Sequence, residues 1–257
     1  MNCDSPLRVQ LCGRLAIERD GAVVREADFP ARQGRRLWAF LVLHRHQPAG
    51  RSDVAAAIWG DAIPDAWDEA LSARVSRLRR ALRPVTGSCH EPVIRGGEGR
   101  YVLTLPAGSV VDLERATAAL HRAEVLLRQG ALGAALAEAR VATEIAARGF
   151  LNGEDGEWVE GHRRLLAETR AHALECTVNA ELARGNAALA EREAELLVAL
   201  APLRESGHRL LMQALEAGGN RGQAVVAYSR CRRLLREQVG ITPSPETEQL
   251  YRRLTGG

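Results

Sequence analysis

The spacing of apolar residues changes along the 257-residue chain, and this change limits the folds open to it. Apolar and polar residues first alternate, from Leu7 to Ile17, and Asp20-Gly21 then gives a strong signal for a two-residue hairpin. From about Arg32 the apolar spacing becomes helical. After Val111 almost every window is helical and no strand pattern returns. We therefore predict an α+β region followed by an all-α region.

The α+β region is expected to contain three helices and a terminal hairpin. The helices are expected at 32–47, 52–59 and 65–82, the last two capped by Ser52 and Asp65. Two short β-rich runs within 92–105 then flank a glycine-rich turn, as in a β-hairpin. Strands, three helices and a hairpin in this order predict a winged helix-turn-helix domain, which we place at residues 1–110.

Three glycines punctuate the helical region at similar positions. Each of them, Gly130, Gly185 and Gly219, is followed five residues later by an alanine. Gly185 and Gly219 lie 34 residues apart, which is the period of a tetratricopeptide helix pair. A glycine there would separate two helices, and the alanine would let them cross closely. We predict a tetratricopeptide-like domain over 111–257, interrupted by an insertion around 149–158.

The positive charge is concentrated in the first region. All 35 basic residues are arginines, and the formal net charge is +3. Residues 1–112 hold 16 arginines against 13 acids, whereas residues 113–257 hold 19 of each. A modest total charge with a local excess favours a nucleic-acid partner.

Most of this excess lies in the third predicted helix, where ALSARVSRLRRALR (70–83) carries five arginines and no acid. One face of the helix would be apolar and buried: Leu71, Val75, Leu78 and Leu82. The opposite side would be small and basic: Ala73, Ser76, Arg77 and Arg80, flanked by Arg74 and Arg79. A helix without bulk at its closest approach can enter the major groove, where Arg77 could bind a guanine while other arginines contact phosphates.

The alternative is that this face is merely solvated. Most solvated faces mix charges, because Glu–Arg pairs four residues apart stabilise a helix. Here no acid follows Glu69 until Glu91, so we favour nucleic acid. Arg95 and Arg100 beside the glycine turn would add a second contact, with an arginine in the minor groove.

These motifs resemble a known family. The segment VSRLRRAL (75–82), after an Ile-Trp-Gly turn (58–60) and before an Arg-Gly…Gly…Tyr hairpin, is similar to OmpR/PhoB-type winged-helix domains. The segments LNGEDGEW (151–158) and GITPSPETEQLYRRL (240–254) resemble the bacterial transcriptional activator domain. The two in this order resemble the Streptomyces antibiotic regulatory protein (SARP) family of pathway-specific activators.

The resemblance implies a transcriptional activator of secondary metabolism that binds promoter direct repeats as a dimer and recruits RNA polymerase. Base contacts would come from Ala73 and Arg77. Residues near phosphates would be Trp59, Arg74, Ser76 and Arg79, with Arg80 added by its place on the helix. The hairpin near the minor groove would supply Arg95, Arg100 and Tyr101. The loop that touches polymerase or its sigma factor would be Asp61, Ala62, Ile63, Pro64 and Asp65.

Other classes of protein find little support in the sequence. No run is apolar enough for a bilayer, and the first ten residues lack a signal-peptide core, so we expect a cytoplasmic, nucleoid-associated protein without membrane contact. The five cysteines are scattered, which predicts reduced thiols. No metal-ligand spacing, phosphate-binding loop or nucleophile–base set is visible, so we expect no metal, no cofactor and no enzymatic activity. The main alternative function is a helical-repeat interaction scaffold whose basic helix is only surface.

Overall fold

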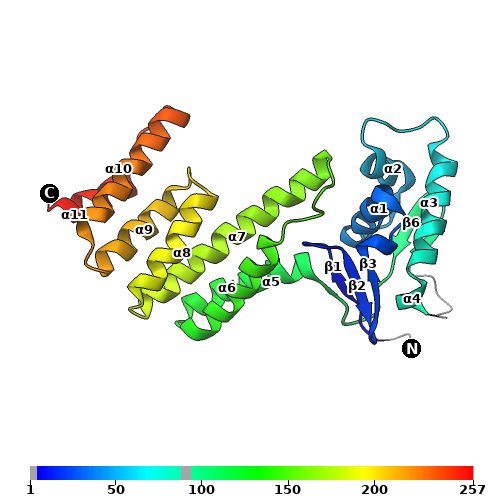
Figure 1. The fold of residues 1–257 in the computed structure, drawn as a ribbon, viewed down its shortest axis with the longest axis horizontal. Coiled ribbons are helices and arrows are strands. Elements are labelled where there is room, and N and C mark those ends of the chain that lie inside the picture. Colours follow the sequence, from blue (N-terminus) through cyan, green and yellow to red (C-terminus); the bar gives the residue numbers. More distant parts are fainter. Residues whose placement is uncertain (1–4, 88–93, 257) are drawn as a thin grey trace. The chain divides into compact units, whose positions relative to one another are not determined.

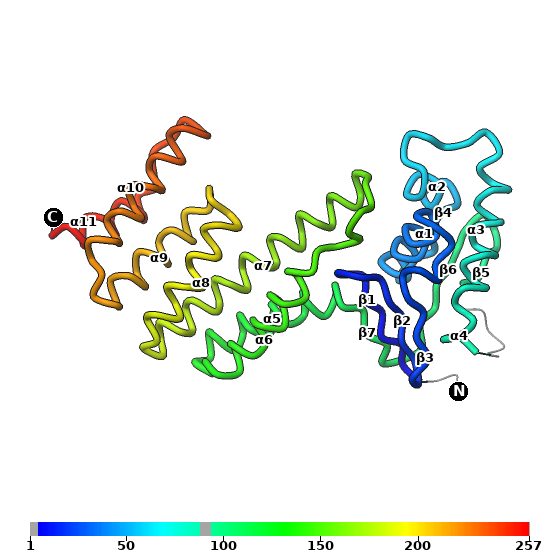
Figure 2. Tube along the Cα trace, viewed as in Figure 1, coloured from blue at the N-terminus to red at the C-terminus, as the bar shows by residue number. Residues whose placement is uncertain are grey.

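The computed structural model describes residues 5–87 and 94–256 (Figure 1 and Figure 2). Its contacts form two compact units, which we describe separately. The first comprises Met1–Arg115 with Arg148–Leu166, and the second comprises Ala116–Ala147 with Ala167–Gly257. The order of elements confirms the predicted α+β region followed by helices.

The first unit opens with a small sheet whose strand order is β3-β2-β1-β7. Its strands are β1 (Arg8–Gln10), β2 (Ala16–Arg19), β3 (Ala22–Arg25) and β7 (Val110–Val111). β1 pairs antiparallel with β2 and parallel with β7. The predicted hairpin is confirmed: Asp20 and Gly21 join β2 to β3 with φ of 48° and 82°, the left-handed conformation that a two-residue turn requires. A 3₁₀ turn, η1 (Glu26–Asp28), follows.

Three helices and a second sheet complete the winged-helix arrangement. The helices are α1 (Ala31–Leu43), α2 (Arg51–Trp59) and α3 (Trp67–Ala81), and a short α4 (Arg83–Thr86) follows. The second sheet has the order β4-β6-β5, with β4 (Ala49–Gly50), β5 (Ile94–Gly97) and β6 (Arg100–Leu103). The predicted hairpin is therefore present as β5–β6, although Pro92 and Val93 lie outside the described residues.

Two predicted helix starts were wrong. Helix α2 begins at Arg51 rather than at a capping Ser52, and α3 begins at Trp67, two residues after Asp65. Within the described residues neither start has a side-chain capping hydrogen bond. The backbone N–H of Arg51 instead donates to the carbonyl of Gly99 in the hairpin, at 3.1 Å. A tertiary contact thus takes the place of the local cap.

Residues 148–166 pack against the N-terminal elements. Trp158 donates its indole N–H to the carbonyl of Ala57 in α2 at 2.9 Å, and its ring lies edge-on to that of Phe40 at 5.8 Å. Glu154 is buried and accepts hydrogen bonds from Arg32 at 2.8 Å and from Arg35 at 2.6 Å. The motif that the sequence marked as an insertion in the helical region is therefore part of the packing of the first unit.

Seven helices run from the end of the first sheet to the C-terminus. They are α5 (Asp112–Arg128), α6 (Leu132–Ala147), α7 (Glu157–Ala183), α8 (Ala187–Leu200), α9 (Glu205–Ala217), α10 (Arg221–Gln238) and α11 (Pro245–Thr255). Figure 1 shows α8, α9 and α10 as successive neighbours in the second unit. Gly130, Gly185 and Gly219 each separate two of these helices, with φ between 74° and 79°.

The alanines that follow these glycines are almost completely buried. Ala190 and Ala224 have no exposed surface, and Ala135 is 1% exposed. Ala190 and Ala224 belong to one apolar core with Leu197, Met212 and further side chains of α7 to α11. The glycine–alanine pattern therefore marks helix pairs, as the sequence predicts.

Candidate nucleic-acid interface

Helix α3 divides into a buried and an exposed side. Leu71, Val75, Leu78 and Leu82 are at most 1% exposed, which confirms the predicted apolar face. Burying four such side chains anchors the helix, since each contributes about 1.5–3 kcal/mol. The orientation of the outer side is thereby set by the core beneath it.

The outer side of α3 presents small residues between arginines. Ala73, Ser76, Arg77 and Arg80 are exposed. Within residues 5–87 and 94–256, Arg77 and Arg80 make no hydrogen bond or ion pair. The hydroxyl of Ser76 donates to the carbonyl of Ser72 at 2.9 Å, which keeps this side chain against the helix. The guanidinium groups of Arg77 and Arg80 therefore lie beside a part of the helix surface that has only small side chains.

The two flanking arginines of α3 differ in how the fold holds them. Arg79 donates from Nε and Nη2 to the carbonyl of Ile94, at 3.0 and 2.8 Å, and so ties α3 to strand β5. Arg74 is half-buried, and its Nε is buried with no partner in the described part of the chain. In the sequence these arginines form one group, but they differ in burial and in hydrogen bonding.

The β5–β6 hairpin extends the same surface. Glu98 and Gly99 form its tip with φ of 50° and 73°, and Arg95 and Arg100 on either side of the tip are exposed. Tyr101 is only 4% exposed, because its ring packs into the unit while its hydroxyl accepts a hydrogen bond from Arg51 at 2.8 Å. The structure thus gives Tyr101 a supporting position inside the wing rather than a place on its surface.

Arg51 joins three parts of this surface, although no pattern in the sequence singles it out. It lies at the start of α2, and its guanidinium bonds to Asp68 Oδ1 at 2.6 Å, to Ser72 Oγ at 2.9 Å and to the Tyr101 hydroxyl. Hydrogen bonding to Asp68 is the main cause that raises the pKa of Arg51. This one side chain holds α2, the first turn of α3 and strand β6 in register, a role that only spatial neighbours reveal.

The loop between α2 and α3 is exposed over all five predicted residues, Asp61 to Asp65. Ile63 is 44% exposed, which is high for a large apolar side chain. Trp59, at the end of α2, is half-buried. An apolar residue between two acids on a projecting loop is suited to protein contact.

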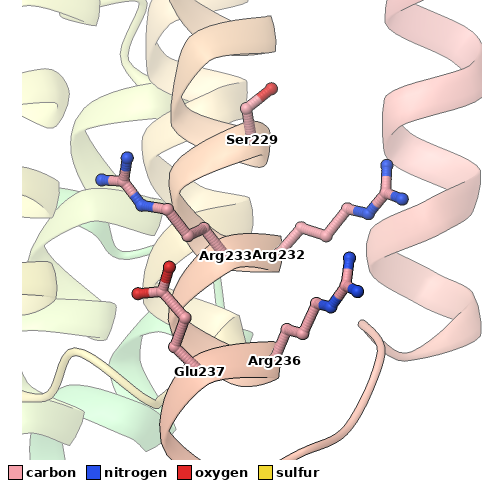
Figure 3. A pocket seen from close by; sticks show the side chains of 5 residues that line it. All are labelled: Ser229, Arg232, Arg233, Arg236 and Glu237. Carbon is pink, nitrogen blue, oxygen red and sulfur yellow. The ribbon is translucent and has the colours of Figure 1, made fainter.

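A second arginine group lies in the other unit, on α10. Ser229, Arg232, Arg233, Arg236 and Glu237 line a groove of about 520 Å³. Figure 3 shows Arg232 and Arg236 extending to one side of α10, whereas Arg233 and Glu237 lie on the other. These three arginines make no hydrogen bond or ion pair with the described residues.

The described residues of the two units offer no candidate metal site. Among the described residues, no group of three or more His, Cys, Asp or Glu side chains is arranged to bind one. Across those same ranges, no helix has the length and apolarity needed to cross a membrane. Cys12, Cys176 and Cys231 are buried free thiols.

The element order and these surfaces define the class of protein: a winged helix-turn-helix unit joined to a tetratricopeptide-like helical unit. The family model described as Bacterial transcriptional activator domain matches residues 111–255, more than half of the chain. The solved structure of Mycobacterium tuberculosis EmbR in complex with a low-affinity phosphopeptide has a TM-score of 0.88 and 26% identity. That match covers 98% of this chain and 65% of the EmbR chain.

Two curated Streptomyces coelicolor proteins are similar over most of this chain. Regulatory protein AfsR is 31% identical over 96% of this chain, and transcriptional regulator RedD is 30% identical over 81%. The chain spans 24% of the length of AfsR and 60% of that of RedD. It belongs to the Streptomyces antibiotic regulatory protein family, whose matched members are transcriptional regulators.

Proposed function

We propose that the protein is a sequence-specific transcriptional activator that binds direct repeats in promoter DNA through α3. The observation that carries this proposal is the outer side of α3, where Arg77 and Arg80 are exposed beside Ala73 and Ser76 and pair with no other described residue. A planar guanidinium can bind guanine O6 and N7 together, and the exposed small residues allow the close approach that this contact needs. We assign DNA binding to residues 1–110 and activation to residues 111–257, in the cytoplasm on the nucleoid.

The arginines of the interface divide between bases, phosphates and the fold. In this proposal Arg77 binds a base, whereas Arg74, Arg80, Ser76 and Trp59 contact phosphates. Arg79 already has its guanidinium on a backbone carbonyl, so it would reach a phosphate with its remaining N–H groups. The exposed Arg95 and Arg100 of the wing would approach the minor groove, with Tyr101 supporting them from below.

Direct repeats imply two protomers side by side on DNA, and activation implies contact with RNA polymerase or its sigma factor. Membership of the family supports both proposals, and it also supports the proposal that the protein controls a secondary-metabolite pathway. The exposed loop Asp61–Asp65 is the proposed polymerase contact. Alanine at Asp61 and Ile63 together should reduce transcription in vitro while promoter binding stays unchanged. Equal loss of binding would show that the loop serves the fold instead.

Footprinting on genomic promoter fragments tests the central proposal. We expect protection of repeated half-sites, with an affinity that falls steeply with salt because arginines displace counterions from phosphates. Binding of all fragments with equal affinity at low salt would replace the activator by the scaffold function, in which the basic helix is only surface.

A further inference from the structure

Arg36 is a buried cation that has no hydrogen-bond partner among residues 5–87 and 94–256. It lies in α1 with 7% of its side chain exposed, and it makes no hydrogen bond or ion pair with any described residue. The nearby carboxylate of Glu154 is already occupied by Arg32 and Arg35. Burial, and then the charge of Arg32, lower the pKa of Arg36. Since buried charges are normally paired, an unpaired guanidinium here calls for an explanation.

The guanidinium of Arg36 lines a groove of about 700 Å³ within the first unit. This volume lies in the range of small-molecule sites. The groove is walled by Phe40, Pro48, Ala57 and Trp158. Gly156 leaves room for the cation, because a Cβ there would lie 2.7 Å from Arg36 Nη2.

The aromatic wall is held in place by contacts of its own. Trp158 is fixed by its hydrogen bond to Ala57, and its ring meets Phe40 edge-on. His44 stacks on Phe40 with 4.0 Å between the ring centroids and so covers one face of that ring, and both side chains line the groove together with Trp158. The groove therefore combines one unpaired cation with a rigid aromatic surface.

Three exposed carboxylates also line the groove: Asp53, Asp61 and Glu157. They would repel a ligand with several negative charges, such as a nucleotide or inorganic phosphate. A ligand with one carboxylate meets less of this repulsion than a ligand with several negative charges. The charges therefore select a monoanion with an apolar body.

We propose that this groove binds a small aromatic carboxylate, with its carboxylate on the Arg36 guanidinium and its ring against Phe40 and Trp158. A guanidinium can give two parallel hydrogen bonds to a carboxylate. The carboxylate of the ligand would thereby be the hydrogen-bond partner of Arg36.

Calorimetric titration of the full chain with 2-naphthoate tests the site. We expect saturable binding of one equivalent, and at least about tenfold weaker binding of the uncharged 2-naphthylmethanol. Arg36→Met should weaken 2-naphthoate binding by a similar factor, whereas the matched control Arg233→Met on α10 should leave it unchanged. Inorganic phosphate should show no binding.

Several results would overturn the proposal. One is equal binding of 2-naphthoate to wild type and Arg36→Met, and another is no saturable binding up to about 1 mM. Thermal unfolding without ligand gives an independent test. Because Met keeps the apolar stem and removes an unpaired charge, Arg36→Met should unfold at the same or a higher temperature. A clearly lower Tm would show that Arg36 serves the fold, and would refute the proposal.

Discussion

Helices α3 and α10 carry similar arginine sequences in very different settings. Helix α3 contains four arginines and α10 contains five, and both helices contain few acids. The outer side of α3 has small residues, a hairpin with two more arginines beside it, and Arg51 bracing the assembly. The arginines of α10 have Glu237 among them and the exposed Val226 on the same helix. Charge alone therefore does not make a basic helix a candidate DNA interface. The small residues, the neighbouring hairpin and the contacts of Arg51 distinguish α3 from α10.

The largest expected effect concerns the buried anchors of the two helices. Leu78→Ala in α3 should destabilise the first unit by about 2–5 kcal/mol, because it removes a fully buried side chain and leaves a cavity. Leu235→Ala, at a 3% exposed position of α10, should act on the second unit. Hydrogen exchange followed by peptide should show faster exchange in α3 for the first variant and in α10 for the second. Faster exchange in both helices for either variant would mean that the units do not unfold separately.

The second-largest difference between the two helices is expected at Arg77, the proposed base-contacting residue. Arg77→Ala should weaken binding to the preferred DNA by about 1–3 kcal/mol and relax the preference at one base position. The matched change on α10, Arg233→Ala, should alter neither. Competition binding against fragments with single base changes measures both quantities. Unchanged preference in Arg77→Ala would assign recognition to another face.

Arg51, which joins α2, α3 and β6, should affect both the stability of the first unit and its binding to DNA. Arg51→Met removes hydrogen bonds to Asp68, Ser72 and Tyr101, and should cost about 1–2 kcal/mol of unfolding free energy. Arg230→Met on α10 removes an exposed arginine for which no hydrogen bond or ion pair occurs within the described residues, and should cost less than about 0.5 kcal/mol. Denaturant titration compares the two. Equal costs would contradict the bracing role of Arg51.

The smallest effect is expected from the α10 group itself. Changing Arg232, Arg233 and Arg236 together to glutamine should leave the salt dependence of promoter binding unchanged. Arg80→Gln on α3 should instead lower the slope of log K against log salt by about 1, the loss of one phosphate contact. Promoter affinities measured across a series of salt concentrations give the slope for each variant. A reduced slope in the triple variant would place α10 on DNA and erase the contrast between the helices.

Several features were predictable because they depend on neighbours along the chain. The spacing of Leu71, Val75 and Leu78 identifies the buried side of α3, since one turn of helix repeats every 3.6 residues. The Asp20-Gly21 hairpin and the glycine breaks between helices follow in the same way, because they reflect local backbone preferences. These patterns were enough to give the winged helix, the helix pairs and the candidate recognition helix.

Other features depend on residues far apart in sequence. Strand β4 has two residues, too few for any periodicity, and exists because Ala49 pairs with Tyr101. Arg79 meets Ile94, and Arg51 meets Tyr101, through contacts that no local pattern encodes.

The sequence by itself determined the class of fold, the face that α3 buries and the excess of arginine on its other side. Only the tertiary structure decided which arginines are available. It ties Arg79 to a carbonyl and lets Arg51 join α2, α3 and β6. It also brings residues 148–166 against α1 and α2, where Arg36 is buried without a hydrogen-bond partner among the described residues. The physical reason is that side-chain pairing depends on distance in space, whereas burial on a helix follows from spacing along the chain.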